Sequence, residues 1–403
     1  MAEIKPFRAW RPKPELAKEI ACVPYDVVTT QEAQKLSKGK PHSFLHVIRP
    51  EIDVNEKTSI YDPKVYEQGR ESLTKLLNSG NFLQEEKDSL YIYRLIMDGR
   101  SQAGIFGCVS VKEYNDDIIL KHELTRPDKE DDRTKHILTQ KAHAEPVMLT
   151  FRDTGEVSGF MDTYMQNNTP IYDFETEDGI SHTLWKVHKS AEVISAFEKV
   201  AHLYVADGHH RCASASRVAK EHESHNPEHS GQEEYNFFPA VVFPMDQMEI
   251  LAYNRVIYSI PDNFLKTLEE NFQLKKNADP VPSKKGDLSF YINGSWHALT
   301  LGESTEKDPA SQLDVSRLQA QILEPLLEIK DQRTDSNINF VGGIKGTDEL
   351  ENLVDNGEAS LAFSLYPTDI EELLEVSDAG LLMPPKSTWF EPKLRSGVLV
   401  HTF

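Results

Sequence analysis

The chain has 403 residues, of which 39% are hydrophobic and 27% are charged, a balance typical of a folded globular protein rather than a disordered one. Its formal net charge of -21, from 65 acidic and 44 basic residues, repels nucleic acid phosphates and so disfavours DNA binding. A single core would be unusually large at this length, so we expect two domains.

Cysteine usage and the N-terminal sequence point to the compartment. The three cysteines, Cys22, Cys108 and Cys212, are widely spaced and odd in number, which argues for a reducing cytoplasm and against a disulfide framework. The N-terminus has no apolar core of signal-peptide type, and no run approaches membrane-spanning length. We therefore expect a cytoplasmic protein with no membrane or nucleic acid partner; a homodimer is left open.

Local patterns predict the elements of the first hundred residues. Thr30 followed by Glu32 predicts an N-cap and a short helix. The β-prone run 43–48 predicts a strand, and the apolar spacing over 63–78 predicts a helix. Asp98-Gly99, between two β-prone runs, predicts a tight hairpin.

The middle of the chain alternates predicted strands and helices. Residues 118–127 predict a strand that breaks at its proline, and 128–141 predict a charged helix. The polar run 221–232 predicts a solvated loop. Residues 237–243 and 250–257 predict paired strands that close the first domain.

The pattern changes after residue 260, so we predict domains at 1–260 and 261–403. Asn293-Gly294 predicts a second hairpin. Asp314 and Thr368 are each predicted to cap a helix.

The rest of the chain is organised around residues 202–215. Five mostly apolar, β-prone residues lead into a polar turn, and helix-favouring residues follow. The turn is Asp207-Gly208-His209-His210-Arg211. Glycine allows φ > 0 or a close backbone approach, and the start of a helix offers N–H groups that suit phosphate. The arginine can bind phosphate bidentately, and each imidazole can donate a hydrogen bond or hold a proton. A structural Asp–Arg clamp with histidines as filler is the alternative.

The Asp-Gly-His-His-Arg turn resembles the signature of the ParB/sulfiredoxin-like superfamily, and within it the ADP-dependent free serine kinases. Lys121-His122-Glu123 matches the place where those kinases have a catalytic His-Glu pair. Residues 355–358 lead through a strand and a helix to Pro385-Lys386-Ser387-Thr388, similar to the end of the kinases. The chain also resembles the domain-of-unknown-function 1015 family nearly end to end, through residues 24–28 and 43–51.

These resemblances imply an α/β (α+β) fold. We expect a ParB/sulfiredoxin-like mixed-sheet core with an N-terminal extension, and a smaller C-terminal α/β domain that closes the site. They also imply a small-molecule phosphotransferase that moves a phosphoryl group between ADP or ATP and a hydroxy amino acid, with serine or phosphoserine expected.

The expected site combines residue chemistry with the resemblance. By resemblance, Glu123 is the general base, and Asp207 and His210 are also expected to act in catalysis. Asp207 suits Mg²⁺ or orients Arg211. The expected nucleotide-binding residues are Gly208, His209, Arg211, Lys386, Ser387 and Thr388.

Alternatives remain for the site. Glu123 could instead pair with Arg126 or Arg133 at a strand end. A zinc hydrolase would need ligands with a better spacing than the available histidines, which are His122, His136, His209 and His210.

The N-terminal region and the cysteine next to the turn raise two further points. Four N-terminal residues are suspected to line the same cleft, although a structural role is favoured for them: Tyr25, Asp26, His46 and Arg49. Sulfiredoxin-type chemistry is in doubt because Cys212 follows the turn instead of lying in it.

Two other functions stay open. One is a nucleotide-binding regulatory protein of ParB-like type, and the other is a phosphoserine phosphatase that needs no nucleotide.

Overall fold

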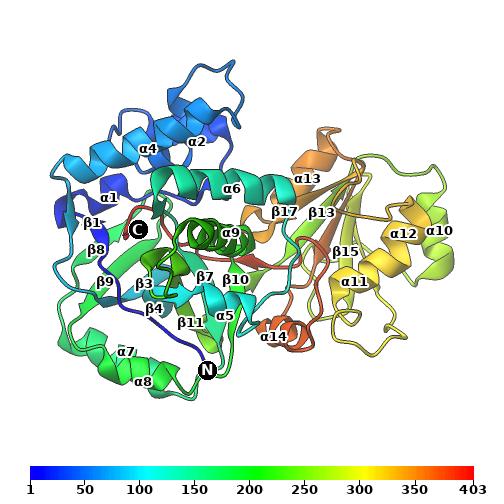
Figure 1. The fold of residues 1–403 in the computed structure, drawn as a ribbon. Helices are drawn as coiled ribbons and strands as arrows, with labels where there is room; N and C mark the ends of the chain where they lie inside the picture. The colour runs from blue at the N-terminus through cyan, green and yellow to red at the C-terminus, as the bar shows by residue number, and fades with distance from the viewer. The chain divides into compact units, whose positions relative to one another are not determined.

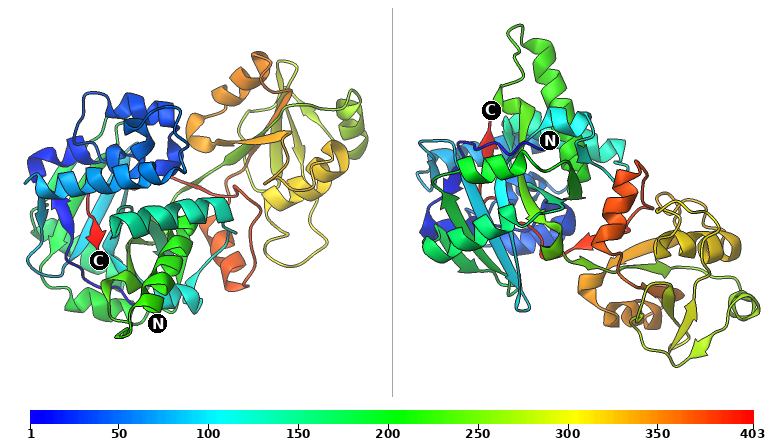
Figure 2. Two further views of the ribbon diagram at one scale, coloured as in Figure 1. Left: turned by 45° about the horizontal axis from the view of Figure 1, so that its top comes forward. Right: turned by 90° about the horizontal axis from the view of Figure 1, so that it is seen from below.

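A computed structural model describes residues 1–403, which divide into two compact units (Figure 1). Unit 1 comprises residues 1–121, 125–248 and 392–403, and unit 2 comprises 122–124 and 249–391. The chain passes from unit 1 to unit 2 after residue 248, which is before the domain boundary expected at residue 260. Its last residues, 392–403, belong to unit 1 again. Both termini belong to unit 1 (Figure 2). No helix of the protein combines the length and the apolar character that crossing a membrane requires.

Unit 1 is built on an eight-stranded mixed sheet in the order β5-β10-β7-β11-β4-β3-β9-β8. Its strands are β3 (Leu90–Met97), β4 (Arg100–Ser110), β5 (Ile119–Leu120), β7 (Val147–Phe151), β8 (Tyr172–Glu175), β9 (Ser181–Val187), β10 (Leu203–Asp207) and β11 (Phe237–Pro244). The pairs β10–β5 and β11–β7 are parallel, and the other neighbours are antiparallel. The mixed sheet confirms the predicted α/β class.

The helices of unit 1 lie against this sheet or pack on one another (Figure 1). They are α1 (Ala17–Ile20), α2 (Thr30–Ser37), α3 (Leu45–Ile48), α4 (Pro63–Asn78), α5 (Val111–Asn115), α6 (Pro127–Gln140), α7 (Glu156–Asn167), α8 (Ala191–Phe197) and α9 (His209–His225). Helix α6 packs against both α9 and α4. Every residue of β7 and β11 is buried, as expected for central strands with both faces covered. Small strand pairs complete the unit: β1 (Trp10–Pro12) with β2 (Phe82–Gln84), and β6 (Ala142–His143) with β20 (His401–Thr402).

Unit 2 contains a six-stranded sheet in the order β14-β16-β15-β18-β13-β17. Its strands are β13 (Tyr253–Ile257), β14 (Lys275–Lys276), β15 (Asp287–Ile292), β16 (Ser295–Thr300), β17 (Ile338–Gly342) and β18 (Leu361–Leu365), and β12 (Ile250–Leu251) pairs with β19 (Trp389–Phe390). Its helices are α10 (Phe264–Asn271), α11 (Asp314–Leu318), α12 (Glu324–Leu327), α13 (Asp348–Asp355) and α14 (Ile370–Asp378).

Both predicted hairpins are confirmed. Asp98 and Gly99 have φ values of 52° and 81° between β3 and β4, and Asn293 and Gly294 have 51° and 74° between β15 and β16. Two consecutive residues with positive φ are what a two-residue hairpin turn needs, which is why Asn-Gly and Asp-Gly are favoured there.

Three predictions for unit 1 were wrong. The strand expected at 43–48 is instead helix α3, whose Leu45, Val47 and Ile48 are buried; tertiary packing overrides their β propensity. The strand expected at 118–127 is reduced to β5. The loop expected from residue 221 is still α9 as far as His225, because His222 in the last turns stacks on Tyr235 at a centroid distance of 5.0 Å.

Strand pairing and helix caps also differ from expectation. Strand β13 pairs with β17 and β18 rather than with β11, which pairs with β4 and β7. The caps of α2 and α14 lie one residue away from the predicted threonines, at Thr29 and Asp369, each in a capping box. Asp314 does not cap α11; its carboxylate accepts the Gly286 amide at 2.7 Å.

Candidate functional site

The predicted strand–turn–helix is confirmed, and its helix runs five residues further than expected, to His225. Strand β10 ends at Asp207, Gly208 has φ 105°, and α9 begins at His209. Glycine is required here because a Cβ atom would lie 3.0 Å from Nε of Arg211, on a backbone conformation that other residues rarely adopt. The first amides of this 17-residue helix have no carbonyl partner one turn earlier in the helix, so they face the turn as donors.

Arg211 points into the protein and is only 7% exposed. Its guanidinium donates one hydrogen bond to the Pro146 carbonyl and another, 3.2 Å long, to Oδ2 of Asp207. Burial alone would lower the Arg211 pKa, but the nearby carboxylates, Asp207 first, raise it above its ordinary value. The geometry is that of the Asp–Arg clamp, so Arg211 braces the turn, and direct binding to phosphate stays a prediction.

Asp207 lies between two cations. Its Oδ2 accepts the Arg211 bond, and its Oδ1 is 3.7 Å from Nζ of Lys393. Asp207 therefore balances part of the charge of these two cations, and the carboxylates of Asp26 and Glu145 also act on Arg211. What the turn offers an anion is the set of amides at the start of α9. The same arrangement does not fit a magnesium ligand, because both carboxylate oxygens are already close to positive charges. Asp207 thus holds the turn together, and magnesium binding at this residue stays a prediction.

The two histidines of the turn differ in setting. His209 is buried, whereas His210 is half-buried. The backbone N–H of Arg126 donates to Nε2 of His210 at 3.1 Å, which places the proton of the neutral ring on Nδ1. This bond fixes the orientation of the His210 ring. Cys212 lies on α9, fully buried, and burial raises its thiol pKa to about 12, so the site has no thiolate for sulfiredoxin-type chemistry.

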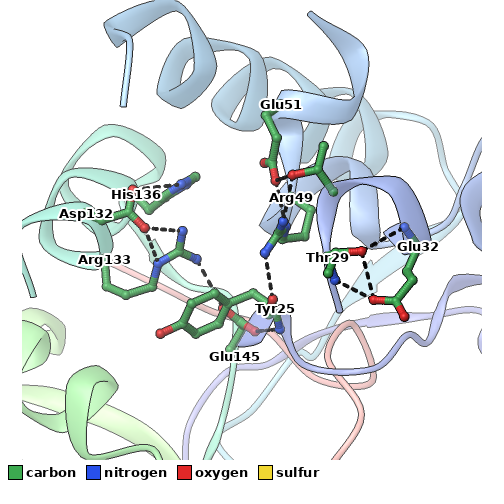
Figure 3. Close-up of polar contacts among 10 residues, drawn as sticks. Tyr25, Thr29, Glu32, Arg49, Glu51, Asp132, Arg133, His136 and Glu145 are labelled. Atoms are coloured by element: carbon green, nitrogen blue, oxygen red, sulfur yellow. Dashed lines mark hydrogen bonds and ion pairs between the residues drawn. The ribbon is translucent and has the colours of Figure 1, made fainter. Parts of the chain in front are cut away.

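A buried polar network lies behind the turn (Figure 3). The carboxylate of Glu145 accepts the Tyr25 amide at 3.2 Å and the Ser396 hydroxyl at 3.3 Å. It also lies 3.6 Å from Arg133, whose guanidinium stacks over the Tyr25 ring at 4.0 Å and binds Asp132 at 2.7 Å. Because the residue after Glu145 is the proline that accepts the Arg211 bond, this network supports the clamp. Sequence analysis missed Glu145 altogether, because no local pattern marks a buried acid.

Part of the suspected N-terminal cluster belongs to this network. Arg49 donates to the Tyr25 carbonyl at 2.9 Å and pairs with Glu51 at 2.6 Å (Figure 3). The carboxylate of Asp26 acts electrostatically on Arg211. His46 pairs with a different residue, Asp53, at 2.7 Å.

His136 lies in the same network, beside a small cavity of about 30 Å³ that Glu145 and Arg211 also line. Its ring packs edge-on against Tyr66 of α4 at 4.8 Å, and burial lowers its pKa well below the ordinary value. It therefore serves as a neutral packing residue between α4 and α6.

The alternative partners of Glu123 have carboxylates of their own. Arg126 pairs with Asp128 at 2.9 Å, and Arg133 pairs with Asp132. The first pair lies at the start of α6 and the second lies within it, so each arginine has a carboxylate partner close to it in the sequence.

In unit 2, the structure brings together two of the predicted motifs. The Met383 amide donates to the His122 carbonyl at 2.8 Å, so the His-Glu motif lies against the start of the loop that ends in Lys386-Ser387-Thr388. Lys386 is exposed, has φ 59°, and holds its Nζ 5.5 Å from the ring centre of Tyr253.

The three residues of this motif have different roles in the loop. The Ser387 hydroxyl is buried and donates to the Pro384 carbonyl at 2.7 Å, so it stabilises the loop itself. Lys386 and Thr388 are the accessible members. A residue that sequence analysis missed, Arg255, donates to the Pro385 carbonyl from below at 3.3 Å.

Fold and site together define an α/β protein with a glycine-containing strand–turn–helix in one unit and a lysine-bearing loop in the other. The chain belongs to the family described as protein of unknown function (DUF1015), which matches residues 4–316.

The solved structures that match this chain resemble it only distantly. A free serine kinase in complex with AMP has a TM-score of 0.39 and 11% identity, over 71% of this chain and 86% of that chain. SbnI with a C-terminal truncation, from Staphylococcus aureus, has a TM-score of 0.38 and 12% identity, over 72% and 85%. A conserved hypothetical protein from Pyrococcus furiosus has a TM-score of 0.35 and 12% identity, over 71% and 90%. No curated protein matches the chain.

Proposed function

We propose that this protein is a small-molecule phosphotransferase that moves a phosphoryl group between ADP or ATP and a hydroxy amino acid, with serine or phosphoserine as the substrate. The observation that supports it best is the turn at residues 207–211. A left-handed glycine starts a long helix there, and two cations face one carboxylate. The amides at the start of a helix, at the positive end of its dipole, favour the terminal phosphates of a nucleotide.

Within this proposal some residues of the turn bind phosphate and others hold the turn in shape. The first amides of α9 and the Nδ1–H of His210 donate to phosphate oxygens, and His209 lines the same turn. Arg211 and Lys393 set the shape and charge of the turn by holding Asp207. Phosphoryl transfer needs mainly this kind of positioning and charge neutralisation.

Glu123 is proposed as the general base. It would take the proton of the substrate hydroxyl as the oxygen bonds to phosphorus, and the nucleotide oxygen would leave with the electron pair. The contact between the His122 carbonyl and the Met383 amide supports a shared role with the loop of Lys386 and Thr388, whose cation and hydroxyl suit the phosphate or carboxylate of a substrate.

A nearly isosteric substitution tests the base. In an assay of serine with ADP or ATP, Glu123→Gln is expected to lower turnover by roughly two to four orders of magnitude. Nucleotide affinity, measured by calorimetry, should stay close to that of the native protein. The control is Glu192→Gln, an exposed acid on α8, which should change neither quantity.

The same experiment separates the alternatives. Near-normal turnover of Glu123→Gln would rule out this mechanism. Release of phosphate from phosphoserine without nucleotide would indicate a phosphatase. Nucleotide binding without transfer to any hydroxy amino acid would indicate a regulatory protein.

A further inference from the structure

Arg255 is a fully buried arginine without an acidic partner. It lies on β13, an interior strand of the unit 2 sheet, and its exposure is 0%. Its guanidinium donates to three neutral acceptors: the carbonyls of Tyr253 and Pro385, and Oε1 of Gln332. The ring of Phe340 covers it at 5.0 Å.

The surroundings of these acceptors are neutral too. Gln332 is itself buried and donates its amide to Gln319 at 2.9 Å, and Gln319 donates onward to the Ile329 carbonyl. A buried cation served only by neutral groups is costly, because nothing replaces the solvation that its charge loses. Burial lowers the Arg255 pKa to about 9, which still leaves the side chain charged at neutral pH.

The loop above Arg255 has its carbonyls turned inward. The Pro384 carbonyl accepts the Ser387 hydroxyl at 2.7 Å, the Pro385 carbonyl accepts Arg255, and the Ser387 carbonyl accepts the Thr368 hydroxyl at 3.0 Å. In a trans peptide the N–H points opposite to the carbonyl of the same unit. The amides of the residues after Pro385 and Ser387 therefore point away from these interior donors.

Those two amides belong to Lys386 and Thr388, the accessible members of the loop. Lys386 has a left-handed backbone (φ 59°), and a turn that includes such a residue can form a concave group of N–H donors, a known geometry for anions. The lysine ammonium and the threonine hydroxyl add a charge and a donor on the same loop.

We propose that Arg255 is a positioning residue that makes the loop 384–388 an anion-binding element, for a phosphate or carboxylate group. Arg255 anchors the Pro385 carbonyl and supplies, from beneath, a positive charge whose counter-ion is the bound ligand. The ligand class rests on the proposed function, whereas the anion site rests on unit 2 alone.

The test is calorimetry of the full chain with three probes: ADP, phosphoserine and serine. Arg255→Met should weaken binding of the probe that occupies the loop by about tenfold or more, because a unit charge a few ångströms below an anion contributes at least that much at an effective dielectric near 20. The melting temperature should not fall in parallel, since replacing an uncompensated buried charge by an apolar side chain is often neutral or stabilising. The probe that loses affinity identifies the source of the anion.

Two further variants make the outcome decisive. Arg255→Lys keeps the charge and should retain more affinity than Arg255→Met. Thr368→Val removes the anchor of the Ser387 carbonyl and should weaken binding several-fold without touching the charge. If Arg255→Met does not fold, these two variants decide the question. The control is Arg317→Met, which removes a half-buried arginine of the same unit that has a carboxylate partner, Asp314 at 3.5 Å, and which should leave anion affinity unchanged.

Unchanged affinity for every probe in the folded Arg255 variants and in Thr368→Val would overturn the inference. Its failure is distinguishable from failure of the proposed function. If anion binding depends on Arg255 but no phosphoryl transfer occurs, the inference stands and the function fails. If phosphoryl transfer occurs and anion affinity does not depend on Arg255, the function stands and the inference fails.

Discussion

Arg211 and Arg255 are both buried arginines that support a loop, and they differ in their counter-charges. Arg211 in unit 1 binds Asp207, and the carboxylates of Asp26 and Glu145 also act on it, so its pKa is raised despite burial. Arg255 in unit 2 has only neutral acceptors, and burial lowers its pKa. The first is a neutralised structural element, whereas the second holds a charge that the protein alone does not compensate. The difference shows why burial of an arginine says little about its role until its partners are known.

The largest expected effect is the loss of Arg211. We expect Arg211→Met to lower the free energy of unfolding by about 3–5 kcal/mol, because it leaves Asp207 and the buried Glu145 without this compensating charge. This change in the free energy of unfolding is measured by urea unfolding of the full chain, monitored with a signal that comes from unit 1.

The matched control for Arg211 is Arg217→Met on the same helix. Arg217 is exposed and pairs with Asp131 at 2.6 Å on the surface, so its loss should cost less than about 1 kcal/mol. Equal and small effects of the two substitutions would show that Arg211 is not a structural clamp.

A second pair of variants removes one neutral hydrogen-bond acceptor from a buried arginine. In one case the arginine has no carboxylate partner, and in the other it has one. Gln332→Leu takes a neutral acceptor from Arg255 and is expected to cost about 1–3 kcal/mol, because a buried charged donor is left unsatisfied. Thr30→Val takes a neutral acceptor from Arg49, which keeps its carboxylate partner Glu51, and should cost less. Thermal unfolding compares them; a larger loss for Thr30→Val would contradict the distinction drawn between paired and unpaired arginines.

Features that depend on adjacent residues were predictable from the sequence. The turn at 207–211 and the hairpin at Asp98-Gly99 are set by backbone requirements that only a few residue types meet, so local sequence identifies them. The mixed α/β class followed from the alternation of such elements. The cap of α2 was predicted at Thr30 but lies at Thr29, because neighbouring threonines offer the same hydroxyl.

Features that depend on distant contacts were not predictable. Glu145 meets Tyr25 and Ser396 from positions more than a hundred residues away along the chain, and no spacing in the sequence indicates this. Strand β13 was expected to pair with its sequence neighbour, because alternation of residue types predicts a strand but not its partner. Arg255 on that strand reads as an ordinary polar position until the sheet is assembled.

The smallest expected effect, and the most specific to Arg255, is a pH dependence. Its folded pKa, about 9, lies below its unfolded value, so Arg255 loses its proton in the folded state as pH rises through about 9. Two consequences follow with opposite signs. The unfolding free energy should rise over this range, because the buried charge that opposed folding disappears.

Anion affinity at the loop 384–388 should fall over the same range, by up to about tenfold, because the charge beneath the anion is lost. Arg211 should keep its proton there, since its carboxylates hold its pKa above the ordinary value. Lys386 carries a second positive charge on the loop, so the comparison also uses Lys386→Met, in which the fall near pH 9 should persist. In Arg255→Met the fall near pH 9 should be absent. A fall that persists without Arg255 would assign the pH dependence to another group and leave the loop with no contribution from the buried arginine.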